Sequence, residues 1–226
     1  MADLPARSFL NPVWSSLGTR HRHFAIERGA ARRYPADVAP FVAVAEPSLA
    51  ALRDLRELME PAESCWIIGS DFPFGDEFVV EQVIECLQMV LPSSVEPAAG
   101  ERLEPMADAA AMVRLTDIAF PGFFRIRTCE MGAYYGVREG GELIAMAGER
   151  LMPGPYSEIS GVCTHPAHRG KGLASKLIWQ LVRDHRRDGL VSWLHVTGTN
   201  SNAIDLYKRM GFETARQVTV SRIRVR

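Results

Sequence analysis

The chain has 226 residues, of which 47% are hydrophobic and 23% charged, and its formal net charge is −1. These fractions are typical of a folded globular protein and exclude disordered, collagen-like and disulfide-scaffold classes. The first 100 residues carry a net charge of −6 and the rest +5, a balance that allows an anionic ligand in the second part but argues against a nucleic-acid-binding surface.

The four cysteines form no Cys-x-x-Cys pair, which argues against a zinc ribbon or a redox dithiol. The first residues lack the order of a signal peptide. The longest apolar run, residues 38–45, is far shorter than the roughly 20 residues that span a bilayer. We therefore expect a cytoplasmic protein with buried thiols and no membrane contact.

Residues 1–100 are expected to form a small α/β domain. Four prolines interrupt the first 40 residues, which are expected to be irregular. A strand over 41–46, a helix that begins at Pro47-Ser48 and a strand over 65–69 follow as a β-α-β unit.

The end of this first part is less clear. The apolar pattern of residues 78–91 fits either a helix or a long strand, because the segment is rich in β-branched residues. Residues 92–105 hold three prolines and a glycine and are the expected linker to a second domain over residues 101–226.

The second domain is expected to alternate helices with strands. The hairpin signal Glu139-Gly140-Gly141-Glu142 joins two of the strands. The pattern predicts a mixed sheet with helices on its faces. The predicted helices cover residues 108–120, 123–131, 171–187 and 201–210. The predicted strands cover residues 134–138, 143–152, 156–164 and 191–196, with one or two more over 212–225.

A glycine-rich turn, residues 169–174 (Arg-Gly-Lys-Gly-Leu-Ala), lies between a predicted strand and a predicted helix. Its glycines let the backbone approach a ligand, and the helix N-terminus offers unpaired N–H groups and the positive end of the helix dipole. The turn matches neither a P-loop nor a dinucleotide fingerprint. It predicts an anion site suited to a pyrophosphate, with a structural turn as the alternative.

Asn200 and Tyr207 lie at the next strand–helix junction. Asn200 is a good helix-capping residue. Tyr207 is either a buried amphipathic ring or, since a phenol has a pKa near 10, a group that protonates a departing thiolate at neutral pH.

Glu158 lies on the predicted strand that leads to the glycine-rich turn. We do not expect this carboxylate in the deep core. It is either a solvated strand residue or a general base whose pKa is raised by partial burial. His165 and His168 are alternative bases, because imidazoles titrate near neutral pH. Their His-x-x-His spacing lies in a loop without an evident third ligand, so we expect no metal.

The run from Glu158 to Ala174 resembles motif A of the GCN5-related N-acetyltransferases (GNAT), whose signature Arg/Gln-x-x-Gly-x-Gly/Ala is matched by residues 169–174. Residues 200–212 resemble motif B of this family. Both motifs are most similar to the branch related to glycine N-acyltransferase, in its C-terminal domain. The resemblance covers about residues 106–220, just over half of the chain.

The resemblance implies an α/β fold with a GNAT-type twisted mixed sheet and helices on both faces. Two adjacent strands of that sheet would splay apart to admit the pantetheine arm of acetyl-CoA. The smaller N-terminal α/β domain would be a degenerate copy of the same fold, as in some relatives, and would wall the acceptor site or mediate dimerisation.

The resemblance also assigns roles at the opening between the strands. Backbone groups of Val162 and Thr164 would pair with the arm, the glycine-rich turn would hold the pyrophosphate, and Asn200 or Asn202 would contact the pantetheine amides. The implied coenzyme A-binding residues are Val162, Cys163, Thr164, Arg169, Gly170, Lys171, Gly172, Leu173, Ala174, Ser175, Asn200, Asn202 and Tyr207.

The predicted function is transfer of an acetyl group from acetyl-CoA to the primary amine of a small molecule or peptide. Glu158, or a water that it orients, would act as the base and Tyr207 as the acid, without a covalent intermediate. Cys163 is therefore expected to be a small buried residue and not a nucleophile. The alternatives are a non-catalytic acyl-CoA sensor and a nucleotide-binding enzyme. No metal and no nucleic acid are expected as ligands, and a homodimer is an open possibility.

Overall fold

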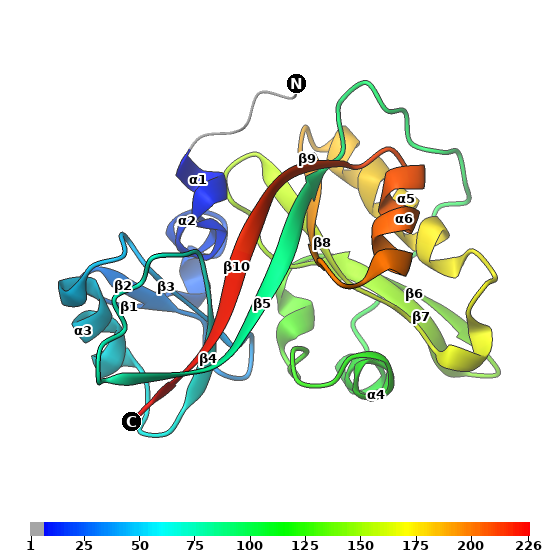
Figure 1. The fold of residues 1–226 in the computed structure, drawn as a ribbon. Coiled ribbons are helices and arrows are strands. Elements are labelled where there is room, and N and C mark those ends of the chain that lie inside the picture. Colours follow the sequence, from blue (N-terminus) through cyan, green and yellow to red (C-terminus); the bar gives the residue numbers. More distant parts are fainter. Residues whose placement is uncertain (1–6) are drawn as a thin grey trace.

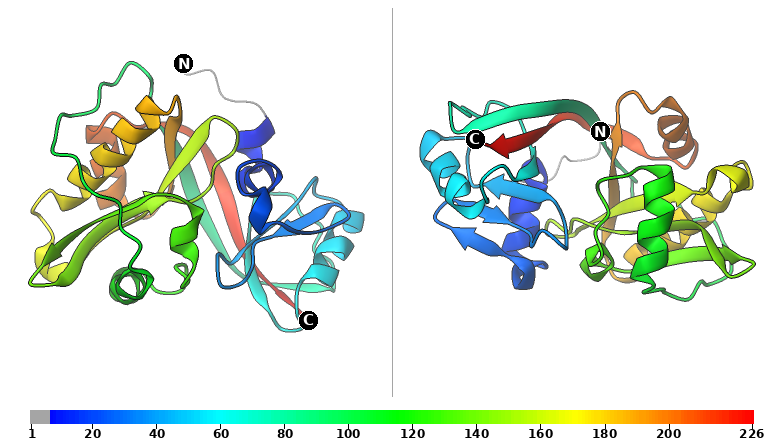
Figure 2. Two further views of the ribbon diagram at one scale, coloured as in Figure 1. Left: turned by 180° about the vertical axis from the view of Figure 1, so that it is seen from behind. Right: turned by 90° about the horizontal axis from the view of Figure 1, so that it is seen from below.

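The structure is a computed structural model that describes residues 7–226. Within this range the strands form one ten-stranded mixed sheet in the order β1-β2-β3-β4-β10-β5-β9-β8-β7-β6. Two halves lie side by side and are connected by the long strands β5 and β10 (Figures 1 and 2). No helix within residues 7–226 has the length and apolar character to cross a membrane.

The first half corrects the expectation that the first 40 residues are irregular. Residues 7–40 contain two short helices and two short strands. Pro5 lies outside the described residues. Pro12 begins a helix whose N-cap, Asn11, accepts a hydrogen bond from the Trp14 backbone N–H, and Pro40 directly precedes the strand Phe41–Val44. The elements are α1 (Arg7–Leu10), α2 (Pro12–Gly18), β1 (Ile26–Arg28), β2 (Ala31–Arg33), β3 (Phe41–Val44), α3 (Leu49–Leu58) and β4 (Ser64–Ile68).

The predicted β-α-β unit is confirmed. Strands β3 and β4 are parallel, and α3 connects them. Ser48 caps α3, because its side chain accepts a hydrogen bond from the Ala51 backbone N–H. Whether this half is a degenerate copy of the second half stays a prediction.

The ambiguous segment 78–91 is strand β5 (Phe78–Val90), and the last segment is one strand, β10 (Glu213–Val225). They pair antiparallel along their lengths, and β10 also pairs with β4 while β5 pairs with β9. Because β5 has a strand partner on each edge, β10 and β9, the segment adopts the extended form and not a helix. The sheet is therefore continuous across the expected boundary at residue 100, and the two-domain division stays a prediction.

The second half confirms the predicted order of strands and three of the four predicted helices. The exception is residues 123–131, of which only Thr128–Met131 forms a 3-10 turn. Residues 91–108 have no regular structure, and the role of residues 92–105 as a linker stays a prediction. The elements are α4 (Ala109–Ala119), β6 (Tyr134–Glu139), β7 (Glu142–Glu149), β8 (Tyr156–Thr164), α5 (Leu173–Arg187), β9 (Val191–Thr197) and α6 (Ser201–Arg209).

The segment before the 3-10 turn is held by tertiary contacts. The Thr128 hydroxyl donates to the Val38 carbonyl at 2.7 Å and accepts from the Arg125 backbone N–H at 2.7 Å. The Arg127 backbone N–H donates to the Asp37 carbonyl at 3.0 Å. These contacts fix the segment against the first half without a helix.

Helices α4 and α5 cover opposite faces of β7 and β8. Met146 of β7 packs with residues of α4, whereas its neighbours Ala145 and Ala147 pack with residues of α5. This alternation follows from the two-residue period of a strand. Both faces of the sheet are therefore buried here, which explains the continuous apolar run of β7.

Strands β8 and β9 separate after a short parallel contact. They pair only at Tyr156–Val191, Ser157–Ser192 and Glu158–Trp193. Beyond this point the pairing of β8 with β7 shifts register near Gly161, which has a φ of +61°. A glycine adopts this conformation without strain, and the bulge bends the strand. The predicted opening between two adjacent strands is thus present.

Candidate active site

A cavity of about 920 Å³ lies at the opening between β8 and β9. One end is lined by the glycine-rich turn and the start of α6. The other end is lined by apolar side chains from β3, β4, β5 and β10 and from the segment after α4. All thirteen residues implied in coenzyme A binding line this one cavity, although they come from separate segments of the chain.

The glycine-rich turn has the backbone expected of an anion site. Gly170 and Gly172 have φ angles of +80° and +73°, and Gly172 is the left-handed N-cap of α5. No side chain caps this helix within the described residues, so its first N–H groups face the cavity with the positive end of the dipole. A Cβ at either glycine would meet no atom within 4 Å, so the space beside the turn is open.

Asn200 is the N-cap of α6 and accepts a hydrogen bond from the Ala203 backbone N–H at 3.2 Å. Its predicted capping role is confirmed, and its amide also lines the cavity. Tyr207 lies about two turns further along α6 and is 7% exposed. Burial raises the pKa of Tyr207 to about 12. The phenol therefore stays protonated at neutral pH and can donate a proton.

Cys163 is buried, as expected, and lines the cavity. Burial raises the pKa of its thiol to about 12. The thiolate is the nucleophilic form of cysteine, so this environment does not favour the nucleophile alternative.

Glu158 corrects the expectation of a partly buried residue with a raised pKa. It is fully buried, and the two oxygens of its carboxylate accept hydrogen bonds from Arg150 Nε at 3.0 Å and Nη2 at 2.6 Å. Burial alone would raise its pKa, but the charges and hydrogen bonds of Arg150 and His195 outweigh burial and lower the pKa to about 2. Glu158 itself does not line the cavity.

His195 of β9 connects Glu158 to the cavity, and sequence reasoning missed it. Its Nδ1 donates to Glu158 Oε1 at 2.7 Å, because a carboxylate only accepts. Its Nε2 lies 3.0 Å from the amide nitrogen of Gln88, which only donates, so Nε2 is the acceptor of that hydrogen bond. An imidazole oriented by a carboxylate is a common arrangement for a general base. The signal in the sequence was a histidine two residues after Trp193 in an otherwise apolar strand.

The histidines predicted as alternative bases differ in position. His168 lines the cavity near the glycine-rich turn, whereas His165 does not. The Nδ1 atom of His165 accepts a hydrogen bond from the Ala167 backbone N–H at 3.2 Å. Residues 7–226 contain no group of three His, Cys, Asp or Glu side chains arranged to hold a metal ion.

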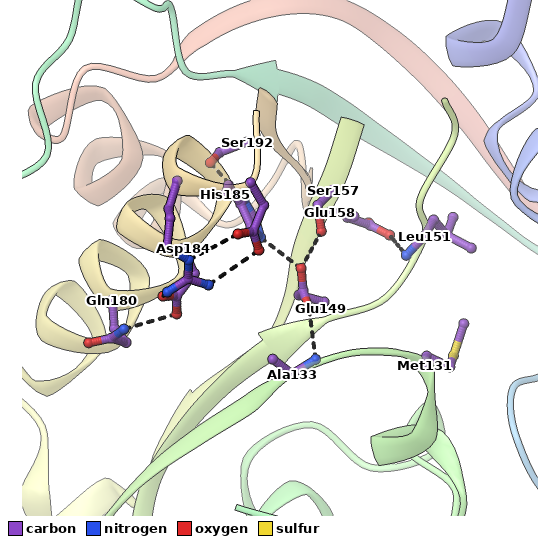
Figure 3. Close-up of polar contacts among 12 residues, drawn as sticks. Met131, Ala133, Glu149, Leu151, Ser157, Glu158, Gln180, Asp184, His185 and Ser192 are labelled. Atoms are coloured by element: carbon purple, nitrogen blue, oxygen red, sulfur yellow. Dashed lines mark hydrogen bonds and ion pairs between the residues drawn. The ribbon is translucent and has the colours of Figure 1, made fainter. Parts of the chain in front are cut away.

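A second buried polar network lies at the closed end of the opening, where β8 and β9 still pair (Figure 3). Glu149 Oε1 accepts from the Ser157 hydroxyl at 2.7 Å and is 3.0 Å from His185 Nε2. His185 Nδ1 lies 2.8 Å from the Ser192 hydroxyl. All four side chains are buried and none lines the cavity, so this chain of groups joins α5 to three strands and has no access to substrate.

Comparisons with known proteins agree with this geometry. The model of the acetyltransferase (GNAT) family matches residues 104–212. A GNAT-family protein from Novosphingobium aromaticivorans is 31% identical, and the alignment covers 98% of this chain and 100% of the other, with a TM-score of 0.87. The chain therefore belongs to the GNAT acetyltransferase family, whose members use acetyl-CoA as co-substrate.

More distant structures share the fold. A GCN5-related N-acetyltransferase from Kribbella flavida is 17% identical over 97% of this chain and 96% of its own, with a TM-score of 0.66. A GCN5-related N-acetyltransferase-like protein from Streptococcus suis is 13% identical over 100% and 95%, with a TM-score of 0.57. No curated protein matches the chain. The glycine N-acyltransferase-like branch stays a prediction.

The ion pair of Glu158 and Arg150 generates a stability prediction. Glu158→Gln leaves Arg150, whose side chain is only partly exposed, without a counter-charge, so the free energy of unfolding should fall by about 3–5 kcal/mol at pH 7. Because the folded pKa of Glu158 is depressed to about 2, its stabilisation is present above the ordinary carboxyl range and is lost as the pH falls toward 2. The difference between wild type and variant should therefore shrink between pH 5 and pH 2, as measured by urea denaturation.

The double variant Arg150→Gln/Glu158→Gln is the matched control, because it removes both charges together. It should be more stable than Glu158→Gln alone. Equal stability of wild type and Glu158→Gln at pH 7 would contradict the buried pair.

Proposed function

We propose that this protein transfers the acetyl group of acetyl-CoA to a primary amine. The observation that carries the proposal is the cavity at the strand opening, which joins an anion-binding helix start at one end to the His195–Glu158 pair and an apolar pocket at the other. The first half of the chain supplies Phe41 and Ile68 to the apolar end, which supports its predicted role as a wall of the acceptor site.

Acetyl-CoA would supply the activated acetyl group. Backbone N–H groups of residues 169–175 would hold the pyrophosphate, and the edge of β8 at Val162 and Thr164, which has no strand partner on the β9 side, would pair with the pantetheine amides. A backbone N–H of this edge would also stabilise negative charge on the carbonyl oxygen under attack.

The protein side chains would manage two protons. His195, held by Glu158, would accept a proton from the amine or from a water beside it, replacing the Gln88 amide at Nε2. As the carbon–nitrogen bond forms and the carbon–sulfur bond breaks, Tyr207 would donate a proton to the departing sulfur. An acceptor that arrives as an ammonium ion would lose its second proton to solvent as the amide forms. His195 would then release its proton to solvent and Tyr207 would regain one, so one proton is released overall and no covalent enzyme intermediate is needed.

Gly172 tests the pyrophosphate site. Acetyl-CoA should stabilise the wild-type fold by about 2.7 kcal/mol at a concentration 100-fold above Kd, visible as a rise in Tm. Gly172→Val should abolish this rise, because the side chain enters the open space beside the turn. Gly189→Val is the matched control, since Gly189 also has a positive φ, +69°, and open space, but does not line the cavity. An undiminished rise in Gly172→Val would contradict the site.

Tyr207 tests the acid. Tyr207→Phe keeps the ring and its packing against Phe212, so the unfolding free energy should hardly change, while kcat should fall about 10²–10⁴-fold. Tyr135→Phe should behave in the opposite way. Tyr135 donates to Asp184 at 2.5 Å and does not line the cavity, so its loss should cost about 1 kcal/mol and leave kcat unchanged. An unaltered kcat in Tyr207→Phe across pH would remove this role.

His195 tests the base. His195→Gln should lower kcat/KM at pH 7 by about 10²–10⁴-fold, because it removes the proton acceptor. His168→Gln alters the cavity histidine near the glycine-rich turn and should lower kcat/KM by less than about tenfold. If kcat/KM falls in His168→Gln and is unchanged in His195→Gln, the base is His168.

A further inference from the structure

The apolar end of the cavity contains one cation. We call this region the acceptor end and define it by Phe41, Ile84, Phe123, Tyr134 and Arg150. The guanidinium of Arg150 lies 4.9 Å from the ring centroid of Phe41, and Trp66 stacks on Phe123 from behind at 5.0 Å. We call Phe41, Phe123 and Tyr134 the aromatic wall. It is packed from outside the cavity by Trp66 and is not a loose surface.

Arg150 has hydrogen-bonding capacity left over. Of its five N–H donors, one on Nε and one on Nη2 are used by the two oxygens of Glu158. Nη1 has no hydrogen-bond partner among residues 7–226, and it is not one of the fully buried unpaired atoms. Since the side chain is 17% exposed and lines the cavity, these donors face the space in which an acceptor would lie.

Charge balance indicates what would bind there. Arg150 and Glu158 neutralise one another, so an amine that arrives as an ammonium ion would place one uncompensated positive charge in a poorly solvated pocket. A carboxylate on the same molecule restores neutrality. It would also satisfy the free donors of Arg150, whose planar fork suits carboxylates.

We propose that the acceptor is a free amino acid with a large apolar side chain, a proposal that rests on the proposed acetyl transfer. Its amine faces His195, its carboxylate binds Arg150, and its side chain packs on the aromatic wall. A peptide N-terminus fits less well, because its first carboxyl group is an uncharged amide. Glycine also fits less well, because it leaves the half-buried Ile84 and Phe123 in contact with water.

The test compares four acceptors by release of the coenzyme A thiol: L-phenylalanine, L-phenylalaninamide, phenethylamine and glycine. A charge-assisted hydrogen bond contributes about 1.5–3 kcal/mol, so kcat/KM for phenylalanine should exceed that for the amide and for phenethylamine by about 10–100-fold. Phenylalaninamide is a less basic amine than phenylalanine, so easier deprotonation cannot produce the preference for phenylalanine over the amide. Glycine should be slower than phenylalanine by at least about tenfold.

Arg150→Lys keeps a positive charge beside Glu158 but removes the forked donor. It should lower the preference for phenylalanine over phenylalaninamide by at least about tenfold, while the rise in Tm with acetyl-CoA stays the same. Arg183→Lys on α5, where the side chain donates to the Ala98 carbonyl outside the cavity, should change neither. The double variant Arg150→Gln/Glu158→Gln should also lose the preference for phenylalanine over phenylalaninamide. This variant is tested by binding alone, because Glu158 also holds the proposed base.

Binding of the four acceptors to the protein saturated with coenzyme A, measured by calorimetry, tests the inference without turnover. Equal binding of phenylalanine and phenylalaninamide would overturn the carboxylate assignment, and equal binding of glycine would overturn the apolar assignment. Selective binding of phenylalanine without release of thiol from acetyl-CoA would instead overturn the proposed transfer and retain the assignment of the pocket.

Discussion

The short parallel contact between β8 and β9 is the constraint on which the site depends. Only three residue pairs connect the strands before they diverge. Two buried carboxylates on neighbouring strands hold this contact from opposite faces of the sheet. Glu149 binds Ser157 and His185, and Glu158 binds Arg150 and His195. A buried charge without its partners is costly, so these networks fix the point at which the strands separate.

The position of the opening determines where the charged groups lie. On the side of α5, the buried network around Glu149 has no contact with the cavity. On the other side, the second network reaches the cavity through two side chains, Arg150 and His195. The same interactions that hold Glu158 as a carboxylate therefore aim an imidazole and a guanidinium at the space where substrates would meet. Stability and proposed chemistry share one set of residues.

The long antiparallel pair of β5 and β10 gives the first half of the chain a role in this site. Strand β10 pairs with β4 near its end and with β5 along its length, and β5 pairs with β9. Through this pairing β4 and its neighbour β3 join the same sheet, and Ile68 and Phe41 of these strands line the cavity. Under the proposed function, acceptor choice would depend on both halves, whereas the thirteen residues implied in coenzyme A binding all lie in the second half.

Features that depend on neighbouring residues could be predicted from the sequence. The glycines of residues 169–174, the capping residue Asn200 and the apolar period of α5 are local signals, so the strand–turn–helix order and the family resemblance were readable without coordinates. The environment of Glu158 was not, because its partners Arg150 and His195 are 8 and 37 residues away. The form of residues 78–91 was also decided by tertiary structure, since both helix and strand suited the pattern and only pairing with β9 and β10 satisfied its backbone on both edges.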